Sequence, residues 1–137
     1  MIIDASVVAK WIFKGEEYRR NSLRIKRMYE ENLVRLKAPC LLLYEVGNAI
    51  WKRKDIDKET AIKLIKLLSE YIKDILVPVD SRLLKKAMEI ARKARITFYD
   101  ASYIALALLD NDIFVTADEE LIKKVKDIVN VKHVSEF

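Results

Sequence analysis

The sequence predicts one α/β domain, a three-layer α/β/α sandwich with a central, mainly parallel sheet. The chain has 137 residues, an ordinary size for a single domain. Short apolar runs alternate with longer segments of helical periodicity along its whole length. Such alternation calls for parallel strands with helices on both faces. No linker, repeat or low-complexity segment interrupts the pattern, so we expect one domain over residues 1–137.

The expected strands are short and almost continuously apolar. They are residues 1–3, 33–39, 75–79, 113–117 and 131–134. Runs of this kind are typical of strands that are buried on both faces. Pro39 and Pro78 stand at or near the ends of two of these runs, where proline marks a strand end or a turn.

The expected helices follow from the spacing of their apolar residues. They are residues 6–12, 17–32, 41–53, 58–73, 81–94, 99–111 and 117–125. The segment 99–111 is apolar nearly all round, which predicts a central buried helix. The segment 58–73 instead places Ile62, Ile65, Leu68 and Ile72 on one face, which predicts an amphipathic helix.

Composition excludes several classes of protein. An apolar fraction of 52% and a charged fraction of 34% favour a globular fold over disorder. With 26 Lys and Arg against 21 Asp and Glu, the net charge is +5, which gives weak support to an anionic partner such as RNA. Cys40 and His133 are the only residues of their kinds, so an internal disulfide and a Cys/His zinc site are excluded.

No apolar run approaches the ~20 residues that a membrane helix needs. Asp4 and Lys10 interrupt the N-terminal segment, where a signal peptide would be continuously apolar. We therefore expect a soluble, cytoplasmic protein with no membrane partner.

Four acidic residues lie beside or within apolar segments, where charge is costly. Asp4 directly follows the expected strand 1–3, and Asp118 directly follows the expected strand 113–117. Asp100 begins the most apolar helix, and Glu45 lies inside another apolar helix. In parallel α/β folds, ligand sites form at the carboxyl ends of the strands. All four acids are expected to be partly buried and to reach the same edge of the sheet.

Three of these acids also have a purely structural interpretation. Asp4 or Ser6 would cap the first helix. Thr97 with Asp100, and Thr116 with Glu119, both fit a capping box, which would place Asp118 in a first helical turn. Glu45 has no such role, because it lies in the interior of its helix.

Together, the four acids favour a metal site. Carboxylates that gather in a medium of low dielectric constant repel one another, so some must hold protons or a cation must lie among them. Oxygen ligands without Cys or His select a hard ion, Mg²⁺ or Mn²⁺. In a basic protein, this combination indicates a phosphodiester hydrolase that uses a metal-activated water.

Four sequence motifs resemble a known family. M-I-I-D-A-S, Y-E-V-G-N-A-I, T-F-Y-D-A-S-Y-I-A-L-A and V-T-A-D-E-E-L, in this order, resemble a PIN domain and, more narrowly, a VapC-type toxin of a toxin–antitoxin pair. The resemblance covers the whole chain. It implies a Mg²⁺- or Mn²⁺-dependent endoribonuclease with Asp4, Glu45, Asp100 and Asp118 as catalytic acids.

The same resemblance implies further properties. Asp4, Asp100 and Asp118 would bind the metal. Ser6 and Thr116 match positions that often carry a polar side chain near the metal, so both are substrate-binding candidates. Asn48 is a third candidate for a separate reason, because it would extend the acidic face of the Glu45 helix. The expected partners are RNA, a small antitoxin protein whose C-terminal segment wraps the toxin, and a second copy in a homodimer.

Other functions remain open at this stage. A phosphoacceptor receiver domain would need paired acids after its first strand, and a haloacid-dehalogenase-like phosphatase would need D-x-D where this chain has D-A-S. A PIN-like RNA-processing nuclease without an antitoxin, and a non-catalytic PIN-like domain that only binds RNA or a partner, are the two closer alternatives.

Overall fold

Five short strands form the centre of the molecule, and all of their pairings are parallel. The computed structural model describes residues 1–137. Its strands are β1 (Ile2–Ile3), β2 (Ala38–Pro39), β3 (Leu76–Val77), β4 (Phe114–Thr116) and β5 (Val131–His133). Strand β4 lies between β1 and β5, and β2 pairs with β3. A parallel bridge between Ile2 and Lys37 joins the two groups, which gives the spatial order β3-β2-β1-β4-β5.

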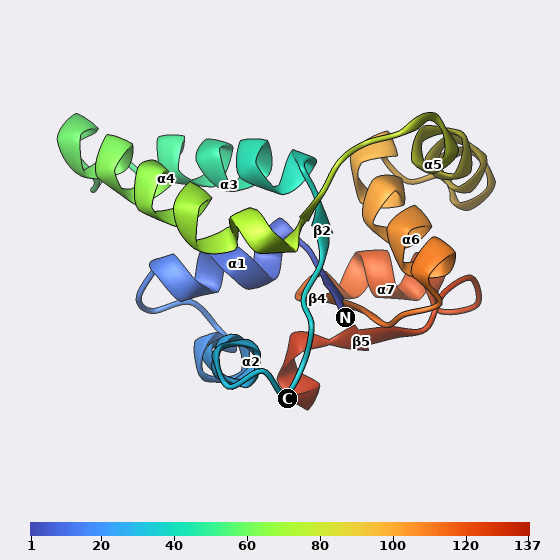
Figure 1. The fold of residues 1–137 in the computed structure, drawn as a ribbon, viewed down its shortest axis with the longest axis horizontal. Helices are drawn as coiled ribbons and strands as arrows, with labels where there is room; N and C mark the ends of the chain where they lie inside the picture. Colours follow the sequence, from blue (N-terminus) through green and yellow to red (C-terminus); the bar gives the residue numbers. More distant parts are fainter.

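Seven α-helices surround these strands. They are α1 (Ala5–Ile12), α2 (Arg19–Glu30), α3 (Leu41–Trp51), α4 (Lys58–Ile72), α5 (Ser81–Ala94), α6 (Phe98–Asp110) and α7 (Glu119–Val125), with short 3₁₀ turns η1 (Lys73–Ile75) and η2 (Val134–Glu136). Figure 1 shows α1 to α4 on one side of the strands and α5 to α7 on the other. This arrangement confirms the predicted α/β/α sandwich.

Side chains at the helix starts explain why the helices begin where they do. Five helices begin at a residue whose side chain accepts a hydrogen bond from a backbone amide of the first turn. These residues are Asp4, Asp57, Asp80, Thr97 and Asp118. Each such cap satisfies an amide that would otherwise lack a partner. Two candidate catalytic acids, Asp4 and Asp118, thus have a structural role as well.

Helix α6 lies at the centre of the core, as its composition predicts. Its residues from Ala101 to Ala107 are all buried. The helix contacts β1, β2 and β4 on one side and α5 on the other. Asp100 lies in the first turn of this helix, and Tyr103, one turn later, contacts Glu45 of α3.

The predicted strand 33–39 is only partly correct, because just Ala38 and Pro39 form β2. The amides of Leu33 and Val34 donate to the carbonyl oxygen of Met28 and so close the end of α2. Those amides cannot also take part in a sheet.

None of the helices combines the length and the apolar character that crossing a membrane requires.

Candidate active site

Asp4 anchors the site at the end of β1. Its side chain is 9% exposed, and its Oδ1 accepts hydrogen bonds from the Ser6 amide (3.0 Å), the Val7 amide (3.2 Å) and the Ser6 hydroxyl. Its Oδ2 accepts no protein hydrogen bond. Burial raises the pKa of Asp4 above its ordinary value, although the amides of Ser6 and Val7 and the nearby hydroxyls of Ser6 and Thr116 oppose this effect.

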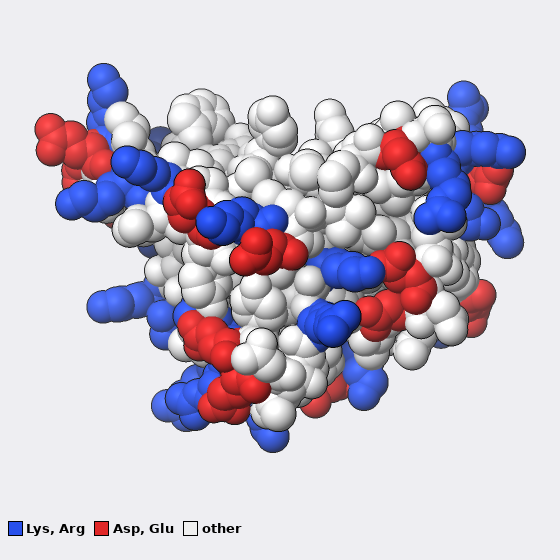
Figure 2. Space-filling view, viewed as in Figure 1, with Lys and Arg blue, Asp and Glu red and all other residues white.

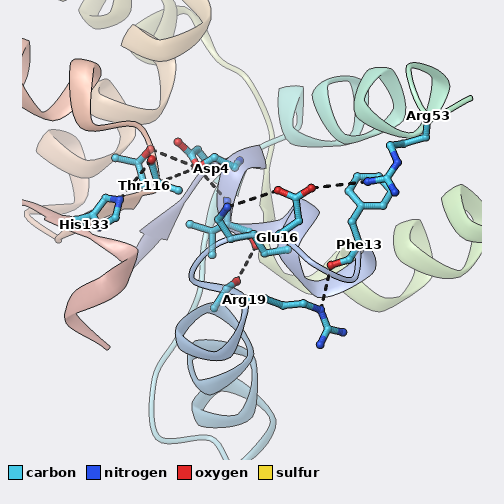
Figure 3. Close-up of polar contacts among 12 residues, drawn as sticks. Asp4, Phe13, Glu16, Arg19, Arg53, Thr116 and His133 are labelled. Carbon is cyan, nitrogen blue, oxygen red and sulfur yellow. Dashed lines mark hydrogen bonds and ion pairs between the residues drawn. The ribbon is translucent and has the colours of Figure 1, made fainter. Parts of the chain in front are cut away.

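The hydroxyls of Ser6 and Thr116 connect the ends of β1 and β4. Ser6 Oγ accepts a hydrogen bond from the Ala117 amide (2.8 Å) and lies 3.4 Å from Thr116 Oγ1. Thr116 is fully buried, and its Oγ1 accepts from the Asp118 amide (3.0 Å). Figure 3 shows Thr116 between Asp4 and His133. Ser6 and Thr116 thus position Asp4 and the backbone at Asp118.

Glu45 enters the same region from α3. Its side chain is half-buried, and its Oε2 accepts a hydrogen bond from the hydroxyl of Tyr103 on α6. Burial is the main cause that raises the pKa of Glu45, and the charges of Asp4 and Asp100 raise it further. The hydrogen bond from Tyr103 opposes this rise. Glu45, Asp4 and Asp100 thus interact electrostatically although they come from three different elements.

Asp100 lies in the first turn of α6 and is half-buried. The Thr97 hydroxyl donates to Asp100 Oδ2 (2.7 Å), and the Asp100 amide donates to Thr97 Oγ1 (3.0 Å). Thr97 therefore caps α6 through its hydroxyl, but only half of the predicted capping box is present, because Asp100 accepts from the Thr97 hydroxyl and not from the Thr97 amide. These contacts leave Oδ1 without a protein hydrogen bond, so capping and ligand binding are compatible at this residue.

Asp118 and Asn48 lie at the margin of this group. Asp118 is exposed, and its Oδ1 accepts from the Leu121 amide (2.9 Å) at the start of α7. Its charge is not among those that raise the pKa of Glu45. Asn48 is exposed on α3, and its side chain makes no protein hydrogen bond. Asp4 and Asp100 thus lie near enough to Glu45 to raise its pKa, whereas Asp118 lies at the rim.

The chemistry of these acids fits a hard divalent cation. Each of the four carboxylates has one oxygen in a positioning hydrogen bond and one oxygen with no protein donor. None of the four is among the acids that form ion pairs with Lys, Arg or the N-terminus. No three acidic, His or Cys side chains lie close enough to hold one ion between them. Asp4, Glu45 and Asp100 would need to draw together around Mg²⁺ or Mn²⁺ to hold it.

An ion-pair network connects α1 with the end of α3. Helix α1 directly follows Asp4, and α3 carries Glu45. Glu16 in the α1–α2 loop lies 3.8 Å from Lys10 Nζ and 3.7 Å from an Arg53 nitrogen just after α3. The Arg53 guanidinium stacks over the Phe13 ring and donates two hydrogen bonds to Asp55. Figure 3 shows Glu16 between these two elements.

Sequence reasoning missed Tyr103. Its side chain is 1% exposed, and its ring stacks on Phe114 of β4. Burial and the charge of Glu45 strongly raise the pKa of Tyr103, so it stays a hydrogen-bond donor. Tyr103 follows Asp100 by three residues, a spacing that puts both on one face of a helix, and this was the available signal.

Two hollows of the surface lie away from the acids. One runs along α2 between Arg20 and Leu33, and another lies between α1, α2 and α4 beside Trp11 and Tyr71. None of the four predicted acids lines either hollow.

Two proteins of known name are similar in sequence to this chain. The chain is 29% identical to Ribonuclease VapC3 of Pyrobaculum aerophilum over 132 residues, which cover 94% of this chain and 97% of that protein. It is 32% identical to Exonuclease VapC9 of the same organism over 92 residues, which cover 67% of this chain and 68% of that protein.

Two solved structures share the fold. The crystal structure of PAE2754 from Pyrobaculum aerophilum aligns with a TM-score of 0.67 and 26% identity over 98% of this chain and 89% of that chain. A toxin–antitoxin complex from Klebsiella pneumoniae aligns with a TM-score of 0.69 and 13% identity over 97% of this chain and 96% of that chain. Residues 1–127 match the family model of the PIN domain. The chain therefore belongs to the PIN domain family.

Proposed function

We propose that this protein is a metal-dependent endoribonuclease and the toxin of a toxin–antitoxin pair. The observation that carries the proposal is that Asp4, Glu45 and Asp100, from three elements, lie near enough for their charges to interact and form no ion pair with any Lys or Arg. The name of the relative Ribonuclease VapC3 supports RNA as the substrate.

The three carboxylates would hold Mg²⁺ or Mn²⁺ through their free oxygens, with Asp118 joining from the rim. A bound ion of this kind activates water and offsets the negative charge that develops on the phosphate. Asp4 and Asp100 are held in place by the hydrogen bonds that cap α1 and α6. Ser6 and Thr116 fix the two strand ends that carry this site.

The products should carry a 5′-phosphate and a 3′-hydroxyl, because water would attack phosphorus and the bond from phosphorus to the 3′ oxygen would break. Cleavage with 2′,3′-cyclic phosphate ends would need a base to activate the 2′-hydroxyl of RNA. His133, the only histidine, instead contacts Ser135 and the Ala117 carbonyl. Analysis of the end groups of a cleaved oligonucleotide tests this, and cyclic phosphate ends would overturn the mechanism.

A circular RNA separates endonuclease from exonuclease activity, a distinction that the relative named Exonuclease VapC9 makes necessary. We expect Mn²⁺-dependent conversion of the circle to linear products, with no conversion by the Asp100→Asn variant. Degradation of linear RNA with an intact circle would contradict the endonuclease proposal and favour an exonuclease. No cleavage of either substrate by the wild type would favour a non-catalytic PIN-like domain.

An antitoxin would inhibit the enzyme most simply by placing an Arg among the acids. Its guanidinium would bind Asp4, Glu45 or Asp100 bidentately and compete with the metal for the same oxygens. Raising Mn²⁺ at constant ionic strength should then weaken inhibition, because screening of charges is unchanged. If neither added Mn²⁺ nor an Arg→Ala change in the antitoxin alters inhibition, the antitoxin instead blocks the access of RNA from outside the acidic site.

A homodimer is supported by an apolar edge of the molecule. Its exposed side chains come from α3, α5 and α6; they are Tyr44, Trp51, Leu84, Met88 and Tyr99. Figure 2 shows mainly uncharged atoms along the top of the molecule, between the charged residues over α4 and α5. Helix α4 also carries two large exposed apolar side chains, Ile62 and Leu67, whereas α2 carries none.

Sedimentation equilibrium tests the dimer. Trp51 is 79% exposed, and a Trp51→Glu change should convert the dimer to a monomer with an unaltered circular dichroism spectrum. Leu33→Glu is the matched control, because Leu33 is 68% exposed and lies outside this edge. A monomeric wild type, or an unaffected Trp51→Glu variant, would overturn the proposed interface.

A further inference from the structure

The hydroxyl of Tyr103 has one protein partner, the carboxylate of Glu45. Tyr103 lies on α6 and Glu45 on α3, 58 residues apart in the chain. The Tyr103 ring is fixed by its stacking on Phe114, with 6.3 Å between ring centroids and an interplanar angle of 25°. A buried phenol needs a hydrogen-bond partner, and here a group of the candidate site supplies it.

Glu45 depends on this contact more than the other site acids depend on theirs. Asp4 receives three hydrogen bonds and Asp100 is held by its own capping residue, both from within the same helix start. Glu45 lies inside a helix, where backbone amides are already used, and it has no cationic neighbour within ion-pair distance. Tyr103 is the only protein donor to its carboxylate.

We propose that Tyr103 is a positioning residue that acts through Glu45. It binds Oε2 and leaves Oε1 free toward the ion that Glu45 would share with Asp4 and Asp100. The inference rests on the proposed function, because it concerns how one acid of that site is held. A hydrogen bond between α6 and α3 also ties Asp100 and Glu45 to each other, since Tyr103 and Asp100 belong to the same helix.

Tyr103→Phe tests this, because it removes the hydroxyl and keeps the ring that packs on Phe114. Tyr71→Phe is the matched control: the Tyr71 hydroxyl donates to Glu30 (2.8 Å), a surface glutamate remote from the site. Mn²⁺ affinity, measured by electron paramagnetic resonance, is the first readout and does not depend on activity. We expect an affinity about tenfold to a hundredfold lower in Tyr103→Phe, as for other partners that orient metal ligands, and no change in Tyr71→Phe.

A double-mutant cycle with Glu45→Gln shows whether Tyr103 acts through Glu45. If it does, adding Tyr103→Phe to Glu45→Gln should lower Mn²⁺ affinity little further, because the two changes remove one interaction. If the losses of Mn²⁺ affinity in the two single variants multiply in the double variant, the inference is overturned. A folded Tyr103→Phe variant with wild-type Mn²⁺ affinity and turnover would overturn it as well. Failure of the wild type to bind Mn²⁺ or cleave RNA would instead refute the proposed function, so the two failures are distinct.

Discussion

Two glutamates accept a hydrogen bond from a tyrosine, but their pKa values shift in opposite directions. Glu30 is exposed, and Lys26 (2.6 Å), followed by Tyr71, lowers its pKa. Glu45 is half-buried and has no cation, so burial and two neighbouring acids raise its pKa despite Tyr103. The same pair of residue types thus forms a stable surface contact in one place and an unneutralised charge in the other.

The difference indicates what each region is adapted to do. On the surface, acids are paired with bases: Lys26 binds Glu30, Lys37 binds Asp110, and Arg53 binds Asp55. At the site, the chain keeps acids without bases, which costs stability in the absence of a cation. An arrangement that opposes stability but leaves ligand oxygens free is typical of a functional site.

The largest expected effect is on activity. Asp100→Asn should reduce RNA cleavage by at least about a thousandfold, because several kcal/mol of charge stabilisation depend on the ligands of the metal. Glu30→Gln should leave turnover unchanged. Single-turnover cleavage at saturating Mn²⁺ measures both, and comparable losses in the two variants would remove the distinction between site and surface.

Stability should respond with opposite signs in the two regions. Without metal, Glu45→Gln should raise the melting temperature by about 3 °C, which is about 1 kcal/mol in a domain of this size. Glu30→Gln should lower it, since the variant loses its ion pair with Lys26. Differential scanning calorimetry in a chelating buffer tests both, and a decrease in both variants would mean that Glu45 is not strained by its neighbours.

The pH dependence follows from the same shifts. Because the pKa values of Asp4 and Glu45 are raised, the stability linked to their protonation is fully present below their ordinary values near pH 4 and is lost as pH rises through the raised values. Glu30 and Asp55 have lowered pKa values, about 2 for Asp55, so their contribution is lost only at acidic pH.

The melting temperature of the metal-free wild type, relative to the Asp4→Asn/Glu45→Gln double variant, should therefore rise as pH falls from about 8 to about 5. Below that range the difference should level off as both acids become protonated in the unfolded chain as well. A difference that is independent of pH would show that the variants act through packing rather than charge.

A smaller effect is expected where a hydroxyl supports an acid. Ser6→Ala removes the hydrogen bonds of Ser6 Oγ with Asp4 and the Ala117 amide, and it should lower turnover about tenfold. Ser69→Ala is the control, because the Ser69 hydroxyl donates only to a carbonyl within α4. Equal turnover of Ser6→Ala and the wild type would remove Ser6 from the site.

The sequence alone predicted the partial burial of two site acids and most of the order of strands and helices. Asp4 directly follows an apolar strand and Glu45 lies within an apolar helix, so their partial burial was expected. The cap at Thr97 was also expected from its spacing to Asp100, but the capping box predicted for Thr116 and Glu119 was wrong, because Asp118 caps α7. The order of strands and helices followed from apolar periodicity, except where the amides of Leu33 and Val34 close α2.

The contacts that the sequence did not reveal are those between distant segments. The Tyr103–Glu45 hydrogen bond and the contact of Ser6 with Ala117 join residues 58 and 111 positions apart. No local pattern encodes such contacts, because they depend on how helices pack around the strands. The exposure of Asp118 was missed for the same reason: its position at a strand end fits both a rim and an interior location.

Mn²⁺ binding tests most directly whether Asp4, Glu45 and Asp100 form one site. Electron paramagnetic resonance of free Mn²⁺ would be recorded for the wild type and for Asp4→Asn, Glu45→Gln, Asp100→Asn and Glu30→Gln. We predict that each of the three site variants loses at least about tenfold in affinity, and that Glu30→Gln binds like the wild type. Wild-type affinity in any of the three site variants, or no binding by the wild type, would contradict the account.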